Sequence, residues 1–336
     1  MRKVTVLGAG SWGTALAVHL GRVGHDVRLW ARDRALVDEM SARRANGAYL
    51  PDIAFPESLS VTHALADALR NAEMVVSAVP SHGCRAVIQS ASPSLAAGAV
   101  IVSATKGLEA GTLLRMSEVI AQEAGATHPV VVLSGPSFAI EVARRLPTAV
   151  LAASHDAAAI ELVQEEFRAP TFRLYGSDDV AGVEIGAAMK NIIAIAAGVV
   201  EGLGLGHNAL AALITRGLAE LTRLACAAGG RRETLAGLSG LGDLVLTCTG
   251  SLSRNRRVGL ELARGRALPE ILGGMKMVAE GVLTTGAALA LGERYGVELP
   301  ITTQMADVLD GRTDVRTAFE ALMLRKQRAE AEPDQE

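Results

Sequence analysis

Lys190 is the residue whose surroundings most favour proton chemistry. It stands near the start of a long apolar stretch and is followed closely by the uninterrupted run Ile192–Val200. We expect such a lysine to be partly desolvated, which lowers the pKa of an ammonium group and lets it exchange a proton with a substrate oxygen near neutral pH. The alternative is that Lys190 extends its ammonium group into water at a domain edge. The polar residues described next favour the proton-transfer role.

Further polar residues come shortly after two predicted strands. Lys106 follows the strand expected at Val100–Ser103, and Gly135 and Ser137 follow the strand expected at Val130–Leu133. In doubly wound folds, ligands bind at the carboxyl ends of the strands. We therefore expect these residues to face a bound ligand, although a surface lysine and an ordinary proline turn are the simpler interpretations.

Ser253, Arg254 and Asn255 form a run that suits a phosphate group. They open a predicted helix, so a hydroxyl, a forked guanidinium and an amide stand beside free helix N–H groups. A solvated basic helix face is the alternative, whereas a nucleic-acid site is disfavoured by a net charge of −3 and by only 3% aromatic residues. Asp243, slightly earlier, could orient Lys190, accept a substrate hydroxyl or cap the helix that follows it.

The sequence Gly8-Ala9-Gly10-Ser11-Trp12-Gly13 matches the G-x-G-x-x-G pattern of dinucleotide-binding loops. It follows a predicted strand and opens a predicted helix, which is the context that this pattern requires. Gly8 permits a tight turn, Gly10 lets the backbone approach a pyrophosphate, and Gly13 lets helix and strand pack closely. An ordinary glycine turn is the alternative, but the context favours binding of NAD or NADP.

The end of the second predicted strand bears on the choice between these two cofactors. Enzymes that use NAD usually place Asp or Glu there, on the ribose hydroxyls. Here Leu29-Trp30 is followed by Ala31-Arg32-Asp33-Arg34. Arg32 or Arg34 could pair with a 2′-phosphate, so we expect NADP to be accepted, and Asp33 leaves NAD possible. A solvated helix start is the alternative.

Composition excludes several classes of protein. The 336 residues are 49% hydrophobic and 21% charged, which excludes a disordered chain. The three cysteines (Cys84, Cys226 and Cys248) are isolated, so we expect a reducing cytoplasm and neither a disulfide framework nor a metal site. No uninterrupted apolar run reaches the roughly 18–20 residues that span a bilayer, so we expect no membrane insertion and read Ile192–Val200 as part of a buried helix.

These residues must be positioned by two kinds of structure. In the first half, short β-branched runs alternate with helical stretches, which predicts an α/β fold with a Rossmann-type doubly wound, mostly parallel sheet. From about Val180 onward only helical patterns remain, so we predict an all-helical second domain. The predicted domains are 1–180 and 181–328, followed by a loose tail at 329–336. The predicted strands are Val4–Leu7, Val27–Trp30, Met74–Val79, Val100–Ser103, Val130–Leu133 and Ala149–Ala152.

Taken together, the motifs resemble those of the bacterial NAD(P)-dependent sn-glycerol-3-phosphate dehydrogenases. The similar segments, which span nearly the whole chain in family order, are GAGSWGTALA at Gly8–Ala17, SATKGLE at Ser103–Glu109, LSGPSFAIEVA at Leu133–Ala143, MKN at Met189–Asn191, ALITRGLAE at Ala212–Glu220 and GLGDLVLTCTGSLSRNRR at Gly240–Arg257. The resemblance implies reversible reduction of dihydroxyacetone phosphate to sn-glycerol 3-phosphate with NADPH or NADH, for phospholipid synthesis.

The resemblance also implies roles for individual residues. Lys190 would be the proton donor and acceptor. The implied substrate contacts are Lys106, Gly135, Ser137, Lys190, Asp243, Ser253, Arg254 and Asn255. Besides the glycines of the loop, the implied cofactor contacts are Ser11, Trp12, Arg32, Tyr49, Lys106, Ala139, Arg254, Val278 and Glu280.

Two other functions stay open on the sequence. One is a two-domain dehydrogenase that acts on a hydroxy acid or sugar acid through a lysine, and the other is a catalytically silent NAD(P)-binding sensor. The second keeps the glycine loop but gives Lys190 and Asp243 no role. For the favoured enzyme we expect a small phosphate substrate, no nucleic-acid partner and a homodimer formed through the apolar helices.

Overall fold

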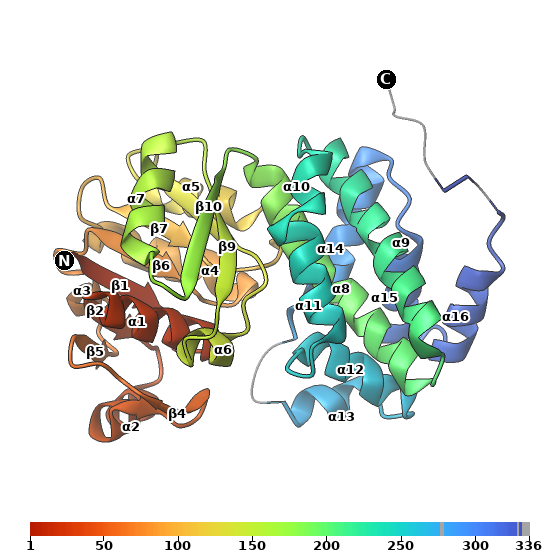
Figure 1. The fold of residues 1–336 in the computed structure, drawn as a ribbon, viewed down its shortest axis with the longest axis horizontal. Coiled ribbons are helices and arrows are strands. Elements are labelled where there is room, and N and C mark those ends of the chain that lie inside the picture. Colours follow the sequence, from red (N-terminus) through yellow and green to blue (C-terminus); the bar gives the residue numbers. More distant parts are fainter. Residues whose placement is uncertain (276–278, 328, 331–336) are drawn as a thin grey trace.

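The computed structural model describes residues 1–275, 279–327 and 329–330. It consists of a sheet covered by helices at one end of the molecule and a group of packed helices at the other (Figure 1). Every described strand precedes Val180. Residues 331–336, most of the predicted tail, lie outside the described part of the chain.

An eight-stranded sheet is built from the first half of the chain. Its strand order is β10-β9-β8-β7-β6-β1-β2-β5, and all neighbours are parallel except β8 and β9. After β1 the chain forms β2 on one side of β1, and later it forms β6 on the other side of β1. The sheet therefore has a switch point between β1 and β6, and doubly wound folds bind ligands at such a point. The strands are β1 (Lys3–Leu7), β2 (Asp26–Trp30), β5 (Leu59–Thr62), β6 (Met74–Ser77), β7 (Val100–Ser103), β8 (Val130–Ser134), β9 (Thr148–Ala153) and β10 (Phe172–Ser177).

The mostly parallel sheet was predicted correctly, and all six predicted strands are present. Met74–Val79 was predicted too long, because β6 ends at Ser77. Strands β5 and β10 were missed. They form the two edges of the sheet, and their partial exposure interrupts the apolar runs that mark the central strands. A short antiparallel pair, β3 (Ala45–Asn46) and β4 (Leu50–Ala54), was also missed.

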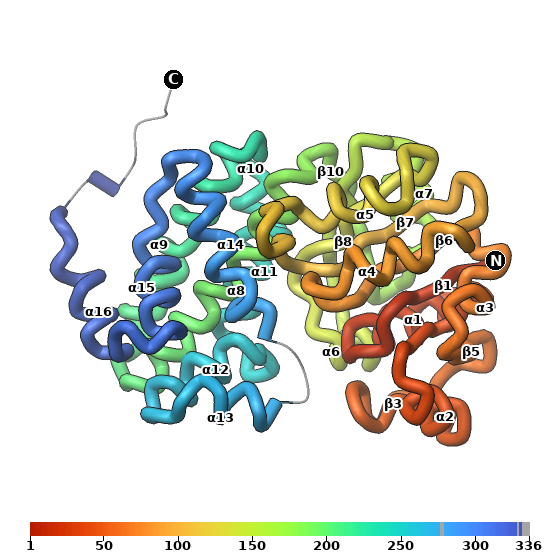
Figure 2. Tube along the Cα trace, turned by 180° about the vertical axis from the view of Figure 1, so that it is seen from behind, coloured from red at the N-terminus to blue at the C-terminus, as the bar shows by residue number. Residues whose placement is uncertain are grey.

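Helices cover both faces of the sheet. One face packs against α1, α6 and α7 through a cluster that includes Leu16, Val142 and Phe167. The other face packs against α3, α4 and α5 through Leu69, Ile88 and Ile120. In Figure 2, which views the molecule from the side opposite to Figure 1, α4 and α5 lie in front of the sheet. These elements are α1 (Ser11–Val23), α2 (Arg34–Arg43), α3 (Leu65–Leu69), α4 (Ser81–Ala91) with a 3-10 turn at Ser92–Ser94, α5 (Met116–Ala124), α6 (Ala139–Ala143) and α7 (Ala157–Phe167).

The second part of the described chain is helical, as predicted, and is organised around α8 (Val180–Gly202). This is the one described helix long and apolar enough to cross a membrane, but its apolar window is entirely buried inside the protein, as in a core helix. The prediction of a buried helix at Ile192–Val200 is therefore confirmed. Its neighbours are α9 (Gly206–Ala227), α10 (Arg232–Ala236), a π-helical turn (Leu238–Gly242), α11 (Asp243–Thr249), α12 (Arg254–Ala263), α13 (Leu268–Gly273), α14 (Glu280–Tyr295), α15 (Pro300–Leu309) and α16 (Val315–Met323).

Two glycines allow α12 to lie directly against α8. A Cβ atom on Gly198 would stand 1.9 Å from the carbonyl oxygen of Arg256, and one on Gly259 would stand 1.8 Å from that of Ile195. Side chains at either position would push the helices apart. This close approach brings the start of α12 beside the middle of α8, where Lys190 lies.

Candidate active site

Two lysine side chains from separate elements meet at one carboxylate. Lys190, on α8, donates a hydrogen bond of 2.7 Å to Oδ1 of Asp243, the first residue of α11. Lys106, in the loop after β7, donates one of 2.5 Å to Oδ2 of the same carboxylate. Three of the predicted site residues, separated by up to 137 positions in the sequence, are thus brought into contact.

Thr247 completes the surroundings of the Lys190 ammonium group. Its hydroxyl accepts a hydrogen bond of 2.7 Å from Lys190 and donates one of 2.6 Å to the carbonyl oxygen of Asp243, one helical turn earlier. An ammonium group has three N–H donors. The described residues accept two of them, which leaves one for a ligand.

Burial and neighbouring charges shift the pKa values of Lys190 and Asp243. Burial lowers the pKa of Lys190 to about 8, with Asp243 acting to raise it and Lys106 to lower it. Burial alone raises the pKa of Asp243, but Lys106 and Lys190 together outweigh this and hold the pKa below its usual value. At neutral pH the carboxylate is therefore ionised, and Lys190 is a protonated acid close to its pKa.

The predicted phosphate run begins α12. The Ser253 hydroxyl caps this helix by accepting a hydrogen bond of 3.2 Å from the N–H of Arg256. Asn255 donates to Oδ1 of Asn191 at 3.0 Å and accepts from the N–H of Gly281 at 3.0 Å. Asn255 is thus held beside Asn191, the residue that follows Lys190 in the sequence. Arg254 is exposed at the helix start.

The loop after β8 contributes a second contact to Lys106. The carbonyl oxygen of Gly135 accepts hydrogen bonds from the Lys106 ammonium at 3.3 Å and from the Ser137 hydroxyl at 3.0 Å. Gly135 has a φ of +139°, and a Cβ atom there would stand 3.0 Å from the backbone of Val150. The turn therefore requires glycine, and its carbonyl oxygen links the loop after β8 to the loop after β7.

The predicted dinucleotide loop has the geometry of an anion cradle. Gly8 has a φ of +104°, and a Cβ atom on Gly13 would stand 1.9 Å from the carbonyl oxygen of Gly8. Helix α1 begins at Ser11, has no side-chain cap and has no acidic residue in its first turn. Its N–H groups can therefore bind a pyrophosphate, so the residues present fit NAD or NADP.

Two aromatic residues expected to contact the cofactor, Trp12 and Tyr49, belong to this loop and to the segment bonded to it. The Ser11 hydroxyl donates a hydrogen bond of 2.6 Å to the carbonyl oxygen of Tyr49, which joins the loop to the β3–β4 segment. Trp12 packs against the sheet core, and its Nε1 is buried without a hydrogen-bond partner. A buried donor without a partner is rare. Its position beside the cradle is consistent with a bound ligand or water as its acceptor.

Of the three charged residues that follow β2, one caps a helix and the other two are exposed arginines. Asp33 caps α2, because its Oδ1 accepts hydrogen bonds from the N–H groups of Ala35 at 2.9 Å and Leu36 at 3.4 Å. Arg32 and Arg34 are exposed at this end of the strand. A helix start is therefore present, as the simpler interpretation held, with an arginine at each side of its cap.

The remaining predicted cofactor residues lie at helix starts. Ala139 is the first residue of α6 and Glu280 the first residue of α14. The Glu280 carboxylate accepts hydrogen bonds from the hydroxyl of Ser81 at 2.7 Å and from its N–H at 3.3 Å. It therefore reaches the start of α4, which follows the carboxyl end of β6. Val278 lies outside the described residues.

Three residues that contact site residues were not predicted from sequence, namely Ser81, Asn191 and Thr247, and neither was Glu184, which contacts the start of α5. A signal existed for Thr247, which stands four positions after Asp243 and so shares its helix face. The partners of Ser81 and Glu184 lie 199 and 67 positions away, which a single sequence does not reveal. No group of three or more metal-binding side chains occurs among the residues that the structure describes.

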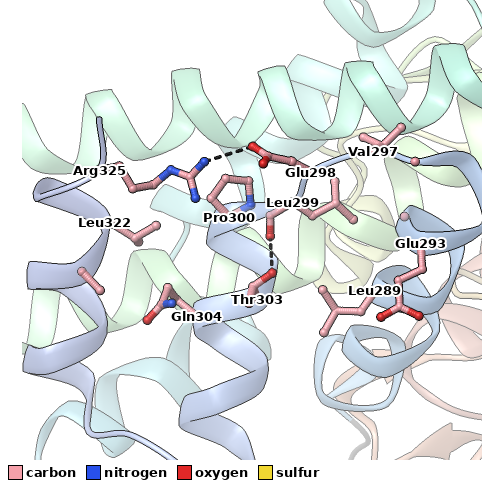
Figure 3. A pocket seen from close by; sticks show the side chains of 13 residues that line it. Leu289, Glu293, Val297, Glu298, Leu299, Pro300, Thr303, Gln304, Leu322 and Arg325 are labelled. Atoms are coloured by element: carbon pink, nitrogen blue, oxygen red, sulfur yellow. Dashed lines mark hydrogen bonds and ion pairs between the residues drawn. The ribbon is translucent and has the colours of Figure 1, made fainter. Parts of the chain in front are cut away.

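A cavity of about 450 Å³ lies away from this site, between α14, α15 and α16. Its wall includes Leu289, Thr303 and Leu322, and an ion pair of 3.1 Å between Arg325 and Glu298 lies at one side (Figure 3). None of the predicted site residues lines it. The cluster around Asp243, rather than this cavity, is therefore the candidate active site.

Known proteins resemble the chain in both sequence and structure. Residues 3–160 match the family described as NAD-dependent glycerol-3-phosphate dehydrogenase N-terminus, and residues 179–320 match the corresponding C-terminus family. The NAD(P)+ glycerol-3-phosphate dehydrogenase of Koribacter versatilis is 53% identical over 81% of this chain and 82% of its own. That of Methylibium petroleiphilum is 50% identical over 98% of both chains. The crystal structure of the Coxiella burnetii enzyme superimposes with a TM-score of 0.93 at 44% identity, covering 96% of this chain and 99% of the other.

Proposed function

Because the chain belongs to the NAD-dependent glycerol-3-phosphate dehydrogenase family, we propose that it reversibly reduces dihydroxyacetone phosphate to sn-glycerol 3-phosphate with NADH or NADPH. The observation that supports this most directly is Lys190, a buried lysine with a pKa of about 8 that has one N–H donor left for a ligand. A reduction of a carbonyl needs such a proton donor next to the carbonyl oxygen.

Binding is assigned to two helix starts. The cradle at Gly8–Gly13 and the start of α1 would hold the pyrophosphate of the cofactor, and Arg32 would contact its adenosine end. When bound, NADH or NADPH supplies the hydride. At the other side of the site, Ser253, Arg254 and Asn255 would hold the phosphate group of the substrate at the start of α12, where N–H groups and a guanidinium favour an anion.

Proton transfer is assigned to Lys190. Its free N–H would donate a proton to the substrate oxygen as negative charge develops there, and in the reverse direction the neutral amine would accept the proton from the alcohol. Asp243 supports the charged form of Lys190, as its effect on the pKa indicates. Lys106, on the other carboxylate oxygen, would add positive charge beside the same substrate oxygen.

The proposal extends to the setting of the enzyme. We propose that residues 1–180 and 181–328 are its cofactor-binding and substrate-binding domains, and that its product supplies glycerophospholipid synthesis in the cytoplasm. We also propose a homodimer formed through the apolar helices. Light scattering tests the last point, because a monomer mass at all concentrations would contradict it.

The central experiment is the oxidation of NADPH and NADH by the purified protein, followed by absorbance. We expect turnover with dihydroxyacetone phosphate and none with hydroxy-acid precursors such as keto acids. Turnover only with keto acids would favour the alternative dehydrogenase. Cofactor binding without turnover of any substrate would favour a silent sensor.

A further inference from the structure

Glu184 is a buried carboxylate on the same helix as Lys190 that has no part in the reaction proposed above. Its residue is only 4% exposed. One carboxylate oxygen accepts a hydrogen bond of 2.8 Å from the N–H of Ser117, and the other accepts one of 2.5 Å from the Ser117 hydroxyl. Arg115 lies 3.5 Å from the second oxygen. These contacts join α8 to the start of α5, beside the sheet.

Glu184 supplies a helix cap that the local sequence lacks. Helix α5 is preceded by Arg115, whose side chain has no oxygen to accept the first N–H groups. Glu118 provides half of a capping box by accepting from the N–H of Arg115 at 2.9 Å. The other acceptor comes from Glu184 on α8, and the positive end of the α5 dipole favours its negative charge.

The start of α5 also closes the loop that carries Lys106. Leu108 forms an antiparallel bridge with Arg115, and the N–H of Glu109 donates to the carbonyl oxygen of Leu114 at 2.9 Å. Leu108 is buried in the core cluster of the helical part, together with Ile185. The base of the loop is therefore held in two ways: by the polar contact of Glu184 on α8, and by the packing of Leu108 in the core cluster of the helical part, which also includes Ile185 of α8.

We propose that Glu184 is a positioning residue for the reaction: by holding the start of α5 on α8, it places Lys106 so that Lys106 and Lys190 reach the same carboxylate of Asp243. This inference rests on the proposed function, which gives the two lysines their roles. Glu184 is about 9 Å from Lys190 along the helix axis, at 1.5 Å per residue, so it acts through the loop and not on the reacting atoms.

The choice of variants follows from the contacts. Glu184→Ala removes both acceptors, whereas Glu184→Gln keeps one acceptor for the Ser117 N–H and can donate to its hydroxyl. Burial raises the pKa of Glu184 to about 7, with Ser117 and Arg115 acting in the opposite direction, so a neutral amide is a close substitute. Ser117→Ala removes one hydrogen bond only and serves if Glu184→Ala does not fold.

Glu220 provides a matched control. It is 2% exposed, lies on α9, and caps α15 by accepting from the N–H groups of Ile301 at 2.5 Å and Thr302 at 3.2 Å. Helix α15 carries none of the predicted site residues. Glu220→Ala therefore removes an equally buried carboxylate cap without touching the Lys106 loop.

We expect Glu184→Ala to lower kcat/KM for dihydroxyacetone phosphate by roughly 10- to 100-fold, the effect of a displacement of about 1 Å in a site. Glu184→Gln should recover most of this loss, and Ser117→Ala should show a smaller loss. The dissociation constant for NADPH should change less than twofold in all of them. Glu220→Ala should lower the melting temperature comparably but leave kcat/KM unchanged below it.

Hydrogen exchange provides a readout that does not depend on the reaction. Glu184→Ala should speed amide exchange in residues 106–117, and Glu220→Ala should speed it only at the start of α15. Equal kcat/KM for Glu184→Ala and wild type, or equal losses in Glu184→Ala and Glu220→Ala, would overturn the inference. If the wild-type protein itself does not turn over dihydroxyacetone phosphate, the proposed function fails instead.

Discussion

Lys190 donates a hydrogen bond of 2.7 Å to Asp243, and both side chains are buried. The carboxylate is shared with Lys106, so two ammonium groups face one negative charge and the ionised cluster carries a net charge of +1 (two minus one). Burying a cluster with a net positive charge costs free energy unless a further negative group approaches it. A developing alkoxide on the substrate is a group of that kind, which is why this arrangement suits carbonyl reduction.

Replacing Lys190 tests its role as proton donor. Lys190→Ala should lower kcat for dihydroxyacetone phosphate reduction by about 10²-fold or more, the usual contribution of a general acid, while the dissociation constant for NADPH stays within about twofold. Steady-state kinetics and a fluorescence titration measure the two quantities. Lys326→Ala, at an exposed position, is the control and should match wild type. An undiminished kcat in Lys190→Ala would rule out the assignment.

The pH dependence follows from the pKa of Lys190. Burial lowers this pKa to about 8, so the ammonium form needed for reduction is present below pH 8 and is lost above it. We expect kcat/KM for reduction to be level below about pH 8 and to fall tenfold per unit above it, whereas kcat/KM for glycerol 3-phosphate oxidation should rise up to about pH 8 and then level off.

Asp243→Asn extends this test. Because the carboxylate raises the pKa of Lys190, its neutral replacement should move both pH profiles to lower pH. The rates at each pH, measured for both directions, give the shift. Profiles that do not move would mean that another group controls the pH dependence.

Arg254 is expected to bind the phosphate group. Arg254→Ala should raise KM for dihydroxyacetone phosphate by roughly 10- to 100-fold, as expected for loss of a hydrogen bond between charged groups. Arg257→Ala, an exposed arginine on the same helix, is the matched control and should leave KM unchanged. If Arg254→Ala changes only the melting temperature, the arginine belongs to a solvated helix face.

The sequence allowed the fold to be predicted where local patterns decide it. The central strands can be recognised from their continuous β-branched runs, because burial on both faces allows few other residues. The loop at Gly8 can be recognised from its glycines, because a tight turn also allows few other residues. The exposed edge strands β5 and β10 lack such a pattern. The antiparallel direction of β9 depends on how residues 135–147 return to the sheet, which no local propensity records.

The site was predictable in its charged residues but not in its geometry. Lys106, Lys190 and Asp243 could each be identified from their neighbours in the sequence, and the structure brings them together. That Asp243 bridges the two lysines depends on contacts between segments 53 and 137 positions apart in the sequence. That Ser81 and Glu184 connect the sheet to the helices depends on contacts between distant segments, which only the folded chain shows.

Arg32 and Arg34 flank the cap of α2, and single variants separate their roles. Arg32→Ala should raise KM for NADPH by roughly 10-fold or more and leave KM for NADH nearly unchanged, because only NADPH carries the 2′-phosphate. Arg34→Ala is the matched variant and should affect neither. A larger effect from Arg34 would assign the contact to that residue, and no effect from either would leave both as solvated side chains.

Gly10 and Gly13 should respond differently to a methyl group, because the space around them differs. A Cβ atom on Gly13 would stand 1.9 Å from the carbonyl oxygen of Gly8, whereas one on Gly10 would meet no protein atom within 4 Å. Gly13→Ala should therefore lower the free energy of unfolding by about 1–3 kcal/mol, the usual cost of overpacking. Gly10→Ala should keep the stability of wild type but weaken NADPH binding by roughly 10-fold, because its methyl group would occupy the space predicted for the pyrophosphate. Thermal unfolding and NADPH titration of both variants check this, and wild-type affinity in Gly10→Ala would show that the cofactor does not bind against this loop.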